Sequence, residues 1–71
     1  MKTYRIKFNF TQMKRNGHIK EMRGYVDYET FATPIQMYHD PELKESLIQH
    51  AESSTDCKVL NMIIASITEI K

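Results

Sequence analysis

The sequence has almost none of the residues that stabilise very small proteins through cross-links. It has one cysteine, Cys57, so no disulfide can form within the chain. Its three histidines, His18, His39 and His50, have neither the spacing of a structural zinc site nor that of two ligands one helical turn apart. We therefore expect no metal and no cofactor, and a small core that depends on close packing or on self-association.

Glycine, proline and long apolar runs are also scarce. With only Gly17 and Gly24, the chain lacks a glycine-rich loop that could hold a nucleotide phosphate. No apolar run approaches the roughly 20 residues of a membrane span, and no signal peptide precedes the first strand-like segment. Because 41% of the residues are hydrophobic and 27% charged, the composition is that of a folded chain. We expect one soluble, cytoplasmic domain over residues 1–71.

Side chains that could carry catalysis stand apart from one another. A reactive Cys57 would need a lowered pKa and a nearby imidazole, and His50, seven positions earlier, is the one candidate. The simpler interpretation of Cys57 is a small, half-buried residue. Asp27 and Glu29 share one face of a predicted strand, but Arg5 neutralises part of that patch. We predict no catalytic residues, and therefore no enzyme.

Charge is divided unevenly along the chain. The first 23 residues hold seven basic residues and one glutamate, a net charge of +6. The remaining 48 hold three basic and eight acidic residues, a net charge of −5. This division suggests an acidic partner for one end, or two copies that meet basic end to acidic end. The alternative is that folding brings the two halves together, so that their opposite charges largely cancel each other's electric field.

The clearest structural signal is a β-hairpin. In residues 3–12, Tyr4, Ile6, Phe8 and Phe10 alternate with polar residues, which is typical of a half-buried strand. Asn16-Gly17 follows, the strongest short-range signal for a hairpin turn.

The loop length follows from the register that it imposes. A two-residue Asn-Gly loop would place charged residues opposite Ile6 and Phe10 on the core face. A three-residue loop, 15–17, with Gly17 in the left-handed conformation, instead pairs Ile6 with Val26 and Phe8 with Gly24. It also places Arg5 opposite Asp27. We therefore predict a second strand over residues 18–29.

The remaining segments complete an α+β fold. Residues 30–39 are open between a helical turn that begins at Thr33-Pro34 and a short strand. Asp40-Pro41 predicts the start of a helix that runs to about residue 52 and ends in a polar linker, 53–56. Residues 58–70, rich in Val and Ile, predict a strand, with a buried helix as the alternative. The prediction is a single ββαβ domain: a three-stranded antiparallel sheet in the order 2-1-3 with one helix on one face.

The hairpin also carries the candidate binding residues. Its outer face combines basic side chains with one aromatic ring, and further basic residues lie at the loop. A solvated face, whose lysines discourage aggregation, is the alternative interpretation. The candidate partner-binding residues are Arg5, Lys7, Lys14, Arg15, Arg23 and Tyr25.

Nucleic-acid binding is the alternative function for this hairpin. Basic groups bind phosphates and an aromatic ring on a sheet can stack on a base. The chain has only one such ring on this face, no ribonucleoprotein motif, and a pI near 7.9. The residues that would contact nucleic acid are Arg5, Lys7, Lys14, Arg15, Lys20 and Arg23.

The last strand predicts self-association. It is apolar on both faces, in a chain too short to cover the second face. The alternative is that residues 30–39 fold over it. We predict a homodimer whose interface comprises Val59, Ile63, Ala65 and Ile67.

With its Asn-Gly hairpin, one helix and closing strand ending in the run 64–70 (Ile-Ala-Ser-Ile-Thr-Glu-Ile), the chain resembles small accessory proteins of phages and prophages. The resemblance is one of overall style along the whole chain, and no functional residue is carried over from it. It implies a non-enzymatic protein-binding module, such as an inhibitor of a host defence protein, that acts in the host cytoplasm.

Overall fold

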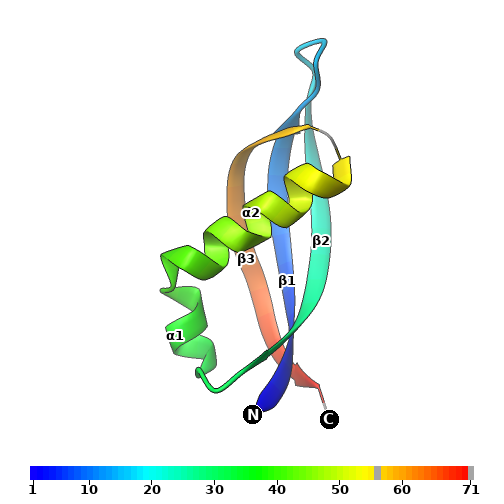
Figure 1. Cartoon of the computed structure of the whole chain (residues 1–71). Helices are drawn as coiled ribbons and strands as arrows, with labels where there is room; N and C mark the ends of the chain where they lie inside the picture. The colour runs from blue at the N-terminus through cyan, green and yellow to red at the C-terminus, as the bar shows by residue number, and fades with distance from the viewer. Residues whose placement is uncertain (56, 71) are drawn as a thin grey trace.

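The alternating first segment forms the central strand of a three-stranded antiparallel sheet. The computed structural model describes residues 1–55 and 57–70. Its elements are β1 (Lys2–Met13), β2 (Ile19–Thr30), α1 (Pro34–Tyr38), α2 (Pro41–Thr55) and β3 (Lys58–Ile70). The strand order is β2-β1-β3, and α2 runs diagonally across one face of the sheet (Figure 1). The predicted α+β class, strand order and antiparallel pairing are confirmed.

The hairpin has the predicted three-residue loop. Ile6 pairs with Val26 and Phe8 with Gly24, as expected. In the turn, the Gly17 amide donates to the Lys14 carbonyl at 2.9 Å, and the Lys14 amide donates to the His18 carbonyl at 2.9 Å. Gly17 has a φ of 85°, a conformation that other residues adopt only at a cost. The glycine therefore determines the turn type, and the turn determines the register.

The core lies between the sheet and the helices. β1 contributes Tyr4, Ile6, Phe8 and Phe10, because every second side chain of a strand points to the same face. The helices and the third strand contribute the other five buried apolar residues, which are Met37, Leu43, Leu47, Ala51 and Met62. Leu43, Leu47 and Ala51 thus form one buried stripe along α2, with Ile48 half-buried at its edge.

Residues 30–39 contain a short helix, so the helical alternative was right and the strand wrong. Thr33 caps α1: its hydroxyl accepts from the Gln36 amide at 3.3 Å, while the Gln36 side-chain oxygen accepts from the Thr33 amide at 2.9 Å. This reciprocal pair is a capping box. It orients α1 so that Met37 enters the core, where it is 1% exposed.

The second helix begins where expected and ends later. Asp40 accepts from the Glu42 amide at 2.9 Å, as a helix-capping residue does. The predicted end at residue 52 was wrong, because α2 continues through residues 53–55; residue 56 lies outside the described residues. Glu52 is half-buried, and its carboxylate accepts from the Val59 amide at 3.2 Å, which joins α2 to the start of β3.

Two irregularities in β3 explain why both of its faces look apolar. The pairing with β1 shifts between Lys7 and Phe8 and again between Thr11 and Gln12. Each shift leaves one extra residue in β3, Ala65 in the first case and Leu60 in the second. A bulge of this kind resets the side-chain alternation. As a result, the side chains that pack against the core are Val59, Met62, Ile64 and Ile67.

Candidate protein-binding surface

The sheet face that points away from α2 is open to solvent. We call it the outer sheet face. Strand pairing brings residues that are distant in sequence side by side across it: Lys7 pairs with Tyr25 on β2, and Asn9 lies between Arg23 on β2 and Ile63 on β3. The outer sheet face comprises the exposed residues Arg5, Lys7, Asn9, Arg23, Tyr25, Asp27, Ile63 and Ala65.

An ion pair and a cation–π contact order one part of this face. The Arg5 Nε donates to the Asp27 Oδ1 at 3.0 Å, and its Nη2 donates to Oδ2 at 3.3 Å. The Arg5 guanidinium carbon also lies 4.9 Å from the centre of the Tyr25 ring. The hydrogen bond from Arg5 lowers the pKa of Asp27, and the same bond raises the pKa of Arg5. Arg5 therefore positions Tyr25, and the carboxylate of Asp27 already balances the positive charge of Arg5.

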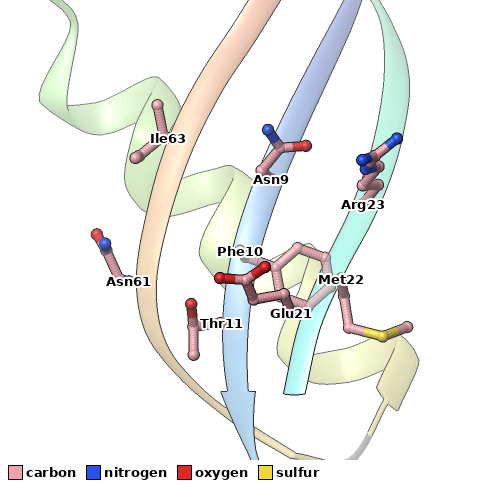
Figure 2. A pocket seen from close by; sticks show the side chains of 8 residues that line it. All are labelled: Asn9, Phe10, Thr11, Glu21, Met22, Arg23, Asn61 and Ile63. Carbon is pink, nitrogen blue, oxygen red and sulfur yellow. The ribbon is translucent and has the colours of Figure 1, made fainter. Parts of the chain in front are cut away.

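A shallow hollow of about 410 Å³ opens on the same face, beside the hairpin (Figure 2). Residues of all three strands border it, and they offer amide, hydroxyl, carboxylate and guanidinium groups together with three apolar residues. This is a hydrogen-bonding surface, without a paired nucleophile and base. The lining residues are Asn9, Phe10, Thr11, Glu21, Met22, Arg23, Asn61 and Ile63.

A second hollow of about 400 Å³ adjoins the first and shares Asn9 and Arg23 with it. Lys7, Tyr25 and Ala65 also line it. The backbone of Gly24 and the edge of Phe8 complete the lining. The two hollows thus lie on either side of Arg23, and Tyr25, which is 60% exposed, borders one of them.

The structure brings together only part of the predicted partner-binding set. Arg5, Lys7, Arg23 and Tyr25 share the outer sheet face. Lys14 and Arg15 instead lie on the hairpin loop, at the end of the molecule that projects beyond α2 (Figure 1). We call residues 14–20 the hairpin tip. The sequence prediction had likewise placed some of these residues on the outer face and the others at the loop.

The four residues predicted as a dimer interface do not share one face. Val59 and Ile67 pack against the core, because the two bulges turn them to the side of α2. Ile63, 60% exposed, and Ala65 remain on the outer side. The common-face placement was therefore wrong, and the apolar patch is half the size expected. Dimerisation through Ile63 and Ala65 stays a prediction.

Sequence reasoning missed an exposed apolar group at the other end of the molecule. Phe31, Ile35 and Tyr38 are 81%, 72% and 46% exposed. Ile35 and Tyr38 are three residues apart on α1, and this helical spacing was the signal that could have placed them on one side of it, whereas Phe31 precedes the helix. It also missed Gln12, which is buried and whose Oε1 has no hydrogen-bond partner. Strand alternation from Tyr4 onward would have placed Gln12 on the core face.

The described residues give no support to metal or thiol chemistry. Within residues 1–55 and 57–70, no three His, Cys, Asp or Glu side chains are grouped so that they could hold a metal ion. Cys57 is half-buried and unpaired by a disulfide. Over the same part of the chain, neither helix has the length and apolar character needed to cross a bilayer.

Comparison of the chain with protein-family models, with curated proteins and with solved structures finds no match. Function is therefore inferred from the surfaces described above.

Proposed function

We propose that this protein is a non-enzymatic protein-binding module whose contact surface is the outer sheet face. One observation supports this function: the helices leave one side of the sheet uncovered, although β1 and β3 are 12 and 13 residues long. On this side lie an ordered aromatic ring, that of Tyr25, and two adjoining hollows. Tyr and Arg are the residues most often responsible for affinity at protein interfaces. Here Tyr25 and Arg23 lie close together on a rigid sheet.

Rigidity favours binding because fewer side chains must be ordered when the partner arrives. Tyr25 is held by Arg5, which is itself held by Asp27. Arg23 lies between the hollows, where a partner's carboxylate or carbonyl could accept its hydrogen bonds. The partner that fits this surface best presents an apolar side chain for one hollow and a hydrogen-bond acceptor for Arg23.

A protein of this size would act on such a partner by occupying its surface, as an inhibitor does. The exposed positive charge of the hairpin tip would then mainly raise the rate of encounter with an acidic partner. This is the function that the phage-like style of the chain also implies.

The experiment is affinity capture from the native host, followed by titration calorimetry with the captured protein. We expect Tyr25→Ala and Arg23→Ala each to weaken binding by about 30-fold, the effect of losing a side chain worth roughly 2 kcal/mol. Lys44→Ala, an exposed change on α2, is the matched control and should leave affinity unchanged. Equal affinities for all three variants would refute the outer sheet face as the contact surface.

Nucleic-acid binding is the second candidate, because the basic side chains of the hairpin tip are exposed and unpaired. Among the described residues, Lys14, Arg15 and Lys20 form no ion pair. If the tip binds phosphates, affinity for a DNA or RNA duplex falls steeply with salt, and Lys14→Glu with Arg15→Glu removes it. A mobility shift that is absent at low salt would eliminate this function.

A further inference from the structure

The molecule has a third recess, on the side of the sheet that α2 covers. It is a groove of about 290 Å³ where α2 crosses β2. We call it the α2–β2 groove. Its lining residues are Val26, Asp27, Tyr28, Asp40, Glu42, Leu43, Ser46, Leu47 and His50.

The groove is apolar within and acidic at its rim. Leu43 and Leu47 are buried members of the core and form part of its wall. Asp40 and Glu42, at the start of α2, are exposed and form no ion pair with any described residue. Asp27 also lines the groove, but its charge is already balanced by Arg5. The occupant that fits is a positively charged segment with an exposed aliphatic side chain.

The hairpin tip has this chemistry. Ile19, at its end, is 64% exposed and lies between His18 and Lys20, both of which are also exposed. Burying an isoleucine that is mostly exposed is favourable by about 1–2 kcal/mol, so Ile19 can contribute to a contact that its basic neighbours orient. Lys14 and Arg15 add two positive charges at the same end of the molecule.

A chain cannot place its own tip in its own groove. Ile19 and Val26 lie on the same strand, β2, seven residues apart, which corresponds to about 24 Å at 3.4 Å per residue. Since the strand is paired along its whole length with β1, it cannot fold back. The occupant that matches the groove in charge and in apolar character must therefore come from another molecule.

We propose that the hairpin tip of one copy of this protein docks into the α2–β2 groove of a second copy. Ile19 packs against Leu43 and Leu47, and the basic residues of the tip face Asp40 and Glu42. The contact is head-to-tail, so a pair keeps one free tip and one free groove, and the assembly can grow further or close into a ring. The uneven charge of the sequence, +6 over the first 23 residues and −5 over the rest, becomes the source of this polarity.

This inference does not depend on the proposed function. Apart from Asp27, which borders both surfaces, the outer sheet face takes no part in the contact and stays open in every copy. An assembly of this kind would present several outer sheet faces at once.

The test combines two variants, each of which removes one half of the contact. The tip variant carries Ile19→Asp and Lys14→Glu; the groove variant carries Glu42→Lys and Ser46→Lys. We expect the mass of the native protein, measured by light scattering, to rise with concentration and to fall with added salt. Each variant alone should stay at the 8.4 kDa of one chain.

The mixture of the two variants is decisive. Each still has one intact half of the contact, so an equimolar mixture should form a pair of twice the single-chain mass and nothing larger. Glu45→Lys, an exposed charge reversal on α2 outside the groove, is the control and should associate like the native protein. Circular dichroism confirms that each variant is folded.

Three results would overturn the proposal. The first is a native protein that keeps the mass of one chain up to millimolar concentration; the groove would then be free to bind a different basic partner. The second is that the tip variant and the groove variant, each measured alone, still self-associate. This is the result expected if copies meet through their outer sheet faces. The third is that the mixture of folded variants contains no pair.

Discussion

At the scale of single residues, the two glycines are required for unrelated reasons. Gly17 has open space around it and is needed for its positive φ. Gly24 has an ordinary backbone, but a Cβ there would lie 2.9 Å from two ring atoms of Phe8. Because Phe8 is buried between sheet and helix, its ring has little room to move.

We therefore expect Gly24→Ala to lower the free energy of unfolding by about 1–3 kcal/mol, the usual cost of overpacking. Chemical denaturation would measure it. In a Phe8→Leu background the ring is absent and the added cost of alanine should largely disappear, which a double-mutant cycle detects. Additive effects of the two changes would show that the Phe8 ring is not what excludes a side chain at position 24.

The Arg5–Asp27 pair predicts a pH dependence. Its hydrogen bonds lower the pKa of Asp27 in the folded state, so the pair stabilises the fold above the unfolded-state pKa of about 3.9. That contribution is lost as the pH falls through the lowered value. Both side chains are exposed, so the effect on stability is small.

A carboxyl-carbon NMR titration should show the Asp27 pKa return toward its ordinary value in Arg5→Gln. The acid limb of the stability profile should become shallower in the same variant. An Asp27 pKa that is the same in both proteins would mean that Arg5 does not pair with it in solution.

At the scale of elements, a helix or strand could be predicted from the sequence where several local patterns favoured the same structure. The hairpin was predictable in full, because turn type, loop length and alternation all select the same register. The bulges in β3 were not, because apolar residues from Val59 to Ile67 fit either face and nothing in the pattern locates the extra residue. The common face predicted for the four interface residues was wrong for that reason, while Arg23 and Tyr25, on the regular strand, lie on the face predicted for them.

The short helix α1 depends on its cap. Thr33→Ala removes the acceptor for the Gln36 amide and should lower the free energy of unfolding by about 1 kcal/mol. The loss of unfolding free energy should be larger than for the same change in a helical turn that packs against nothing, since α1 carries Met37 into the core. Thr33→Ser keeps the acceptor and is the control; equal destabilisation by both changes would attribute the effect to the threonine methyl group.

At the scale of the whole molecule, the central question is whether one chain supplies a complete core. The sequence suggested that a neighbour would have to cover the last strand. In the structure, the bulges turn Val59 and Ile67 inward, and the buried apolar residues of β1, β3 and the two helices form one cluster within a single chain. The outer sheet face that remains is polar over most of its area, with Ile63 and Tyr25 as its large exposed apolar side chains.

We therefore expect the stability of the groove variant, Glu42→Lys with Ser46→Lys, to be independent of protein concentration. A contact that forms only between folded copies raises stability with concentration. Urea unfolding at micromolar and at near-millimolar protein should give one midpoint for this variant, and a midpoint that rises with concentration for the native chain. If the midpoint of the groove variant also rises, a second copy must cover the sheet around Ile63 and complete the core. Adding Ile63→Lys to the groove variant would then abolish the rise.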